Sequence, residues 1–345
     1  MTKLHIQTAA AYFCLLLPPL LWAGNFIIGR AATEIDPFTL NLLRWIVAGL
    51  CLLPVLLWHF RSAMRALRSR YLLIISLTAL GIIGFNTVLY AGLKSTPAGA
   101  AGVLFGVTPL LILALSRLWL RHPLTFFSGL GGILAFCGLV FVLSGGLSMA
   151  GFEWRGAALV GVSAMIFAAY TVTLQHAALE LRGEVCLALT IWLGLLVMAP
   201  FAALRPDSWI TLHEAIQVLP AVLYLGVGAS LLAFFAWQSG VRVLGAQKAG
   251  VFLQLVPVFG VVLGWLILDE SLAQGKLVGL LCIICGVVIA QVPGKTRNAA
   301  KASADRDDDL PRFVLDERYL TARRAKVAVN CIPARDASGV PVARV

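Results

Sequence analysis

Long apolar stretches fill most of this sequence, and they limit what the chain can fold into. A helix needs roughly 20 apolar residues to cross about 30 Å of hydrocarbon, and ten stretches approach or exceed that length. They span residues 10–29, 38–58, 71–93, 97–116, 124–144, 155–174, 184–204, 216–238, 247–268 and 276–292. The sequence therefore predicts an all-α, polytopic membrane protein with ten transmembrane helices in a lipid bilayer.

The composition excludes the soluble alternatives. Hydrophobic residues make up 60% of the 345 residues and charged residues only 12%, whereas soluble domains carry about 25% charged residues. So few polar side chains cannot cover the surface of a soluble enzyme of this size. The first stretch contains Pro18, Pro19 and Trp22 and has no clean A-x-A cleavage site, so we expect a retained span rather than a signal peptide.

Basic residues outside the apolar stretches indicate the orientation. The net charge is +11, and its lysines and arginines are spread over loops and a tail, so no nucleic-acid partner is expected. The loop HFRSAMRALRSR alone carries Arg61, Arg65, Arg68 and Arg70. Cytoplasmic loops are enriched in such residues, so we predict a multi-pass protein of the inner (cell) membrane with both termini in the cytoplasm.

An internal repeat divides the chain. A shift of 148 residues superimposes identical residues without a gap. Among the matches are Ala101, Gly102 and Val103 with Ala249, Gly250 and Val251, Pro109 with Pro257, and Cys137 and Gly138 with Cys285 and Gly286. Each copy holds five stretches, and an odd number makes the second copy enter the membrane from the opposite side. We predict a first five-helix repeat at 1–145, an inverted second repeat at 150–292, and a charged, disordered cytoplasmic tail at 293–345.

Several motifs over residues 10–292 resemble the EamA-type ten-helix transporters of the drug/metabolite transporter superfamily. The segments that carry the resemblance are LLWAGNFIIGR, DPFTLNLLRW, LKSTPAGAAGVLFGVTPLL and VLGAQKAGVFLQLVPVFGVVLGWLILDESL. The family often has a Glu after both proline-containing helices; Glu270 fits, but Arg121 and His122 occupy the equivalent place in the first copy. The resemblance implies secondary transport of a small organic solute, with export driven by proton exchange or by the solute gradient.

Polar residues at membrane depth are the candidates for a substrate site. Arg44 is the strongly placed charge, and two roles stay open: contact with an anionic substrate or a gate with Glu34 or Asp36, or a structural role at backbone carbonyls. Amides in spans bind either a substrate or a neighbouring helix. The predicted substrate-binding residues are Trp22, Asn25, Arg44, Asn86, Tyr90, Trp237, Gln238 and Gln254.

Two prolines inside apolar stretches are candidate hinges. Pro109 and Pro257 remove a backbone hydrogen bond at matching positions of the two copies. The kinks they produce serve either as hinges for rocking or as static bends.

Motifs for catalysis, metals or cofactors are not expected. The five histidines have no ligand spacing, and Cys282 and Cys285 lie inside a lipid-depth stretch where cysteine packs as a small hydrophobe. The sequence has no Walker A lysine motif, G-x-S-x-G or H-E-x-x-H. We therefore predict no catalytic residue, no metal and no cofactor.

Together these features predict a secondary active transporter, not an enzyme, that moves a small organic solute such as an amino acid or related metabolite by alternating access. Two other classes stay open: a membrane-embedded enzyme acting on lipid-linked substrates, and a non-transporting membrane sensor. The expected partners are a small-molecule substrate and the bilayer. The oligomeric state is left open between monomer and homodimer.

Overall fold

The structure is a computed structural model of the full chain, and it describes residues 2–32, 34–119, 125–144, 153–177, 182–204, 211–268 and 274–292. The chain separates into the units Met1–Gly294 and Lys295–Val345, and all of these residues belong to the first. The predicted tail at 293–345 lies outside the described residues, as do Arg121, His122 and Glu270. The bounds of the three predicted domains stay predictions.

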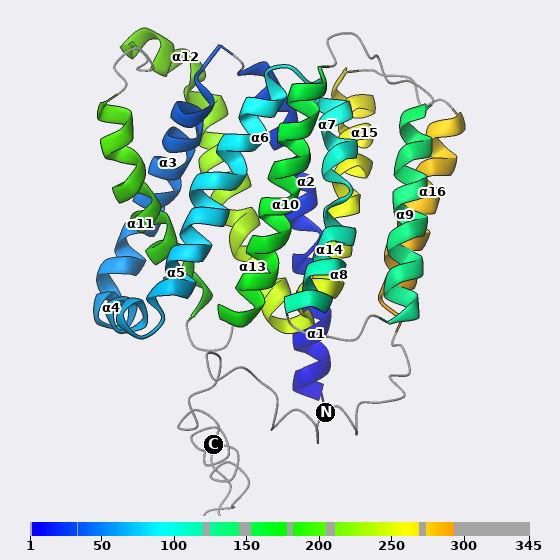
Figure 1. The fold of residues 1–345 in the computed structure, drawn as a ribbon, viewed down its shortest axis with the longest axis horizontal. Coiled ribbons are helices and arrows are strands. Elements are labelled where there is room, and N and C mark those ends of the chain that lie inside the picture. Colours follow the sequence, from blue (N-terminus) through cyan, green and yellow to red (C-terminus); the bar gives the residue numbers. More distant parts are fainter. Residues whose placement is uncertain are drawn as a thin grey trace, which may run out of the picture. The chain divides into compact units, whose positions relative to one another are not determined.

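The first half of the chain is helical throughout its described parts (Figure 1). Its elements are α1 (Thr2–Cys14), α2 (Leu17–Ala31), α3 (Pro37–Trp58), α4 (Phe60–Ser69), α5 (Tyr71–Leu77), the π-helix η1 (Thr78–Gly84), α6 (Phe85–Leu93), α7 (Ala98–Phe105), α8 (Thr108–Trp119) and α9 (Phe126–Ser144). The Asp36 carboxylate begins α3 by accepting hydrogen bonds from the amides of Phe38 and Thr39, both at 3.1 Å.

The second half repeats this order. Its elements are α10 (Trp154–Ala177), α11 (Gly183–Ala203), α12 (Leu212–Leu223), the π-helix η3 (Tyr224–Leu232), α13 (Ala233–Leu244), α14 (Ala246–Val251), the 3-10 turn η4 (Phe252–Gln254), α15 (Leu255–Leu268) and α16 (Gln274–Ala290). Each of the ten predicted stretches thus coincides with helix, and the prediction of an all-α membrane fold is confirmed.

Six of the helical segments in the described residues are long and apolar enough to cross a membrane. They are Thr8–Ala31, Pro37–Trp58, Tyr71–Leu93, Trp154–Gln175, Gly183–Ala203 and Glu214–Leu244. The shorter apolar helices Thr108–Trp119, Phe126–Phe141 and Leu277–Ala290 lie in the remaining stretches. Six of the ten stretches thus form helices long and apolar enough to cross a membrane, and the count of ten crossings stays a prediction.

The fourth and ninth stretches fall short because each helix is interrupted in front of a proline. Residues 106 and 107 form a turn between α7 and α8, three and two residues before Pro109. The 3-10 turn η4 ends three residues before Pro257. A proline ring clashes with the carbonyl four residues earlier, and both interruptions lie where this clash falls. That these breaks move as hinges stays a prediction.

The two repeats share internal features and run in opposite directions. The 148-residue shift places η1 inside η3, so both repeats carry a π-helix at the same point of their third span. The last helices of the repeats, α9 and α16, stand side by side in Figure 1. Along their contact, residue numbers rise on one helix as they fall on the other, from Gly131 against Gly286 to Gly138 against Gly279. Antiparallel packing of equivalent helices is the arrangement that an inverted repeat requires.

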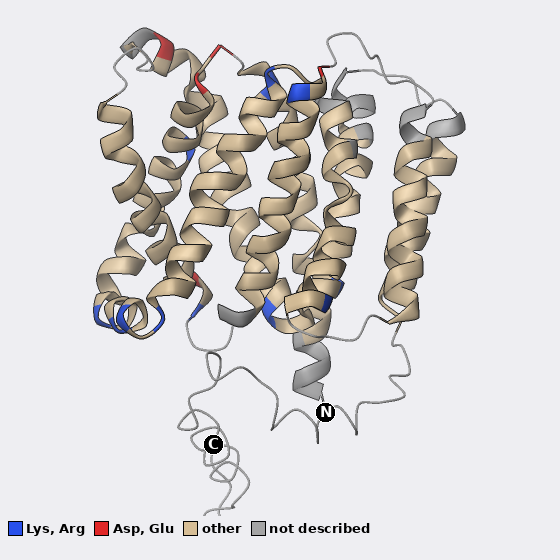
Figure 2. Ribbon diagram, viewed as in Figure 1, with Lys and Arg blue, Asp and Glu red and all other residues tan. Residues whose placement is uncertain are grey.

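Large apolar side chains cover much of the outward surface, as expected beside lipid. Leu57, Leu196 and Val288 are more than 60% exposed, whereas Trp45, Phe167 and Trp237 are fully buried between helices. Charged residues gather near the helix ends and around α4 (Figure 2). The middle of the fold is therefore the place where a buried polar group needs an explanation.

Candidate functional site

Arg44 is a buried positive charge at the junction of the two repeats. Its side chain extends from α3 and has no solvent exposure. Nε donates to Ser230 Oγ at 2.7 Å, and Nη1 faces Asn25 Oδ1 at 3.0 Å, Asn86 Oδ1 at 2.7 Å and Tyr90 Oη at 2.5 Å. Ser230 belongs to η3 of the second repeat, and the other partners belong to α2 and α6 of the first. One guanidinium therefore joins three helices and both repeats.

The partners of Arg44 are all neutral. Glu34 and Asp36 are the predicted gate partners, and neither is among them. The salt bridge seen in the described residues joins Arg182 to Glu184 and does not involve Arg44. Arg44 Nη2 is buried and has no hydrogen-bond partner in the described structure. Removing a charge from water is costly unless an opposite charge compensates it. Among the described residues, the site therefore holds a cation without a compensating anion and with unused N–H groups.

A second set of contacts fixes the neutral partners. Tyr90 Oη donates to Asn25 Oδ1 at 2.7 Å, and Ser230 Oγ donates to the carbonyl of Leu225 at 2.7 Å. That carbonyl is five residues before Ser230, which is the spacing of the π-helix η3. The guanidinium is also 5.3 Å from the ring centroid of Trp45. These contacts set the position of the acceptors that Arg44 meets.

The π-helices supply carbonyls to tryptophans across helix contacts. Ile82 O in η1 accepts from Trp45 Nε1 at 2.8 Å and from Asn41 Nδ2 at 3.0 Å. Ala229 O in η3 accepts from Trp22 Nε1 at 3.0 Å. A π-helix departs from the regular hydrogen-bond ladder and is common at functional sites. Both π-helices thus accept a hydrogen bond from a tryptophan of the first repeat, and Trp45 and Ala229 each adjoin a residue of the Arg44 network.

An aromatic cluster lies beside that network. Trp22 contacts Phe167 at 5.2 Å, Trp237 at 5.5 Å and Phe234 at 5.7 Å between ring centroids. Phe234 in turn contacts Trp45, the neighbour of Arg44, at 5.2 Å. Trp237 Nε1 is buried and has no partner in the described part of the chain. The cluster thus combines apolar ring faces with an unused donor.

Gln238 lies against the same helices. Its Nε2 is 3.4 Å from Tyr170 Oη, and its buried Oε1 has no partner among the described groups. The shift of 148 residues aligns Gln238 with Tyr90, so both repeats place a polar side chain at this register. The two residues nevertheless have different partners, because Arg44 lies only on the first-repeat side.

The predicted site residues divide into three groups. Arg44, Asn25, Asn86 and Tyr90 are in direct contact, and Trp22 and Trp237 belong to the adjoining aromatic cluster, with Gln238 nearby on α13. Gln254 is separate, because its Nε2 donates to Gly132 O of α9 at 3.0 Å. That contact matches the interhelical alternative for this amide. Binding of a substrate by any of the eight stays a prediction.

Sequence reasoning missed residues whose importance depends on neighbours. Ser230 is a small hydroxyl in the apolar run YLGVGASLLAFF, and Phe167 and Phe234 look like ordinary apolar residues. Only the polarity of Ser230 within that run is a signal in the sequence.

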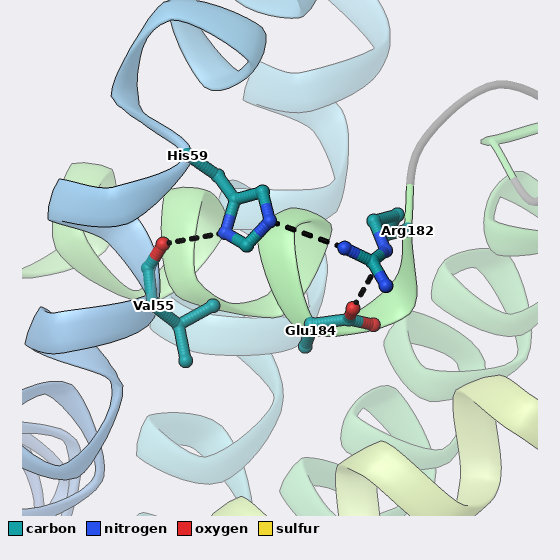
Figure 3. Close-up of polar contacts among 4 residues, drawn as sticks. All are labelled: Val55, His59, Arg182 and Glu184. Atoms are coloured by element: carbon teal, nitrogen blue, oxygen red, sulfur yellow. Dashed lines mark hydrogen bonds and ion pairs between the residues drawn. The ribbon is translucent and has the colours of Figure 1, made fainter.

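A polar contact joins the two repeats at one end of the helices (Figure 3). Arg182 Nη1 donates to His59 Nε2 at 3.2 Å, and His59 Nδ1 donates to the carbonyl of Val55 at 3.1 Å. Arg182 Nε also pairs with Glu184 Oε1 at 3.1 Å. Because one ring nitrogen accepts and the other donates, this geometry requires a neutral imidazole with its proton on Nδ1. The cluster connects the end of α3 to the start of α11.

Comparison with known proteins agrees with this architecture. The sequence model of the EamA-like transporter family matches residues 9–144 and again residues 154–291. Uncharacterized transporter YetK of Bacillus subtilis is 28% identical over 308 residues, covering 86% of this chain and 91% of its own length. Protein PecM of Dickeya dadantii is 26% identical over 285 residues, covering 79% and 89%.

A protein of known crystal structure is similar in fold. Its TM-score against this chain is 0.67 at 21% sequence identity, and the alignment covers 85% of this chain and 98% of that one. At this identity the likeness concerns the fold alone.

Proposed function

The chain belongs to the EamA-like transporter family, and from that premise we propose that it moves a small organic solute bearing a carboxylate, such as an amino acid, by alternating access. We place it in the inner membrane with both termini in the cytoplasm and assign export as its direction. The substrate site is the Arg44 network together with the aromatic cluster beside it.

The uncompensated charge of Arg44 is the observation that carries this proposal. Its described partners are neutral oxygens, and Nη2 has two N–H groups without an acceptor. A carboxylate is a strong acceptor for guanidinium N–H groups, and the free N–H groups of Nη2 can donate to it. A solute with this group supplies the anion that the buried cation lacks.

The other unused polar groups suit an amino acid. Trp237 Nε1 is a second buried donor, and Gln238 Oε1 is a buried acceptor. An acceptor of this kind suits an ammonium group, while the rings of Trp22 and Phe167 offer apolar surface to a side chain. Donors, an acceptor and ring faces are together what recognition of a zwitterion with an apolar side chain needs.

The inverted repeats support alternating access as the mechanism. Two similar halves of opposite orientation can exchange their conformations around a site between them. The described contact between His59 and Arg182 joins α3 of one repeat to α11 of the other at one end. In the proposed mechanism this contact holds that end closed and breaks when it opens.

Counterflow in proteoliposomes tests the proposal. Liposomes holding the purified protein are loaded with one unlabelled amino acid, and uptake of its labelled form is measured for a panel of neutral amino acids. The matched control for each is the corresponding amine without the carboxylate, for example phenethylamine against phenylalanine. We expect counterflow for at least one amino acid and little for its amine.

The two parts of the proposal fail in different ways. Equal counterflow of acid and amine overturns the role of the carboxylate but leaves transport standing. Folded protein that moves no member of the panel overturns transport of this solute class.

A further inference from the structure

The helix α4, between the second and third stretches, carries a stripe of arginines that the transport proposal does not use. We propose that Arg61, Arg65 and Arg68 form a binding site for the headgroups of anionic phospholipids. The occupant is a lipid of the surrounding membrane, and the site is independent of the substrate site.

The inner face of α4 is fixed to the protein. Ala63 is fully buried and belongs to an apolar cluster with Ile74, Val185 and Leu189. Met64 and Leu67 pack against the same cluster. Since α5 and α11 hold this face, the position of the opposite face is defined as well.

The outer face presents three guanidinium groups together. Arg61, Arg65 and Arg68 follow one another at spacings of four and three residues, which places them on one side of a helix. All three are exposed, and with Phe60, Met64 and Ser69 they line a shallow groove of about 570 Å³. A neighbouring hollow of about 600 Å³ is lined by Trp58, His59, Phe60, Arg61 and Arg65, among others. Figure 2 shows the basic residues of α4 as a group at one end of the helices.

The charge of this face is not balanced by the described residues. No ion pair joins Arg61, Arg65 or Arg68 to a carboxylate there, and Glu184 on the neighbouring α11 is paired with Arg182. Like charges four residues apart on a helix repel one another. An anion in the groove removes this repulsion, and phosphate fits guanidinium groups well.

Exposed apolar residues around α4 identify the anion as a lipid headgroup. Trp58 is 88% exposed, Leu57 64%, Tyr71 54% and Phe60 52%. Tryptophan and tyrosine are enriched where membrane and water meet, and basic residues beside such an interface attract anionic lipids. A soluble phosphate ester has no use for this apolar rim, whereas the acyl chains of a lipid cover it.

Native mass spectrometry of the full-length protein in detergent tests the site. The protein is titrated with phosphatidylglycerol or phosphatidylcholine of equal chain length, and bound lipids are counted. We expect wild-type protein to prefer phosphatidylglycerol and the R61Q/R65Q/R68Q variant to bind it at least about tenfold more weakly, because each basic residue near an anionic surface contributes to the attraction. Arg117→Gln, which removes an exposed arginine of α8, is the matched control and should leave the preference unchanged.

Two further measurements keep the test decisive. The R61K/R65K/R68K variant keeps the charges and should keep the preference, and high salt should remove the preference from wild-type protein. Equal binding of both lipids by wild-type protein overturns the proposal. Competition by glycerol 3-phosphate as strong as that by the lipid also overturns it, since the site then binds a soluble phosphate.

Discussion

At the residue scale, the central feature is a charge placed where none is expected. Arg44 is fully buried, contacts Ser230 across 186 positions of sequence, and leaves Nη2 without an acceptor in the described structure. A purely structural arginine would be expected to use all of its donors, because an unsatisfied buried donor is costly. The unused donors therefore favour the proposed binding role over a structural one.

Substitution of Arg44 tests this distinction. Arg44→Gln removes the charge, and we expect the KM for a carboxylate solute to rise by about tenfold to a hundredfold, matching roughly 1.5–3 kcal/mol for a hydrogen bond to a charged group. Arg44→Lys keeps the charge but replaces the planar guanidinium by a single ammonium group. Its KM should lie between those of the wild-type protein and Arg44→Gln. The measurements are counterflow kinetics and the shift of the melting temperature by the solute.

Ser230→Ala is the control for the structural role, since it removes the acceptor of Nε and the hydrogen bond to the Leu225 carbonyl but keeps the charge and Nη2 of Arg44. We expect it to lower thermal stability with little change in KM. An Arg44→Gln protein that folds and transports with the wild-type KM would show that Arg44 has a structural role only.

At the element scale, regular helices are modified at equivalent points of the two repeats. The π-helices η1 and η3 expose the carbonyls of Ile82 and Ala229 to tryptophans, and the helices in front of Pro109 and Pro257 are interrupted. The helices α9 and α16, in contrast, pack without such breaks. The repeat thus places irregular elements at matching points of both halves and a regular helix pair at the contact of α9 with α16.

The contact of α9 with α16 depends on glycine. A Cβ added to Gly131 would lie 2.4 Å from Gly286 O, so Gly131→Ala must separate the backbones. We expect a loss of roughly 1–3 kcal/mol, as for other overpacked contacts, measured as a lower melting temperature in detergent.

Gly129→Ala is the matched control on the same helix. A Cβ there meets nothing within 4 Å, and replacement of a helix glycine by alanine should stabilise by about 0.5–1 kcal/mol. Equal melting temperatures for the two variants would contradict the close packing of α9 against α16.

At the scale of the whole molecule, two inverted repeats enclose the Arg44 network between them. Antiparallel contacts between equivalent helices, Gly131 with Gly286 and His59 with Arg182, give the two halves opposite directions. Six segments meet the length for crossing a membrane, and the crossings at 97–116, 124–144, 247–268 and 276–292 depend on the topology proposed for the ten stretches.

Reporter fusions test the first two of these crossings, at 97–116 and 124–144. With ten crossings, a reporter after Trp119 lies on the cytoplasmic side, and reporters after Lys94 and before Glu153 lie on the opposite side. The physical reason is that each apolar stretch crosses once and so reverses the side of the chain. The measurement is reporter activity on each face of the membrane in cells.

A fusion after Arg70 is the control, because the arginines of α4 place it in the cytoplasm in either case. A reporter after Trp119 on the same side as the one after Lys94 would show that the stretch 97–116 does not cross the membrane.

Local sequence determined which segments are helical and that the chain contains two copies. The length of an apolar stretch depends only on neighbouring residues, and the repeat is visible when the sequence is compared with itself. The bounds of stretches such as 38–58 and 155–174 were therefore predictable within a few residues. The same reasoning identified Arg44 as unusual, because charge at membrane depth is costly wherever it occurs.

Only the tertiary structure decided which polar residues meet. Arg44, Asn25, Asn86 and Ser230 come together through packing of helices from both repeats, while Gln254, equally polar in sequence, contacts a different helix. The carbonyls of the π-helices likewise meet donors on other helices, as Ile82 O does with Trp45 and Ala229 O with Trp22. Helix formation is decided by residues a few positions apart, but a site between repeats is decided by contacts across half the chain.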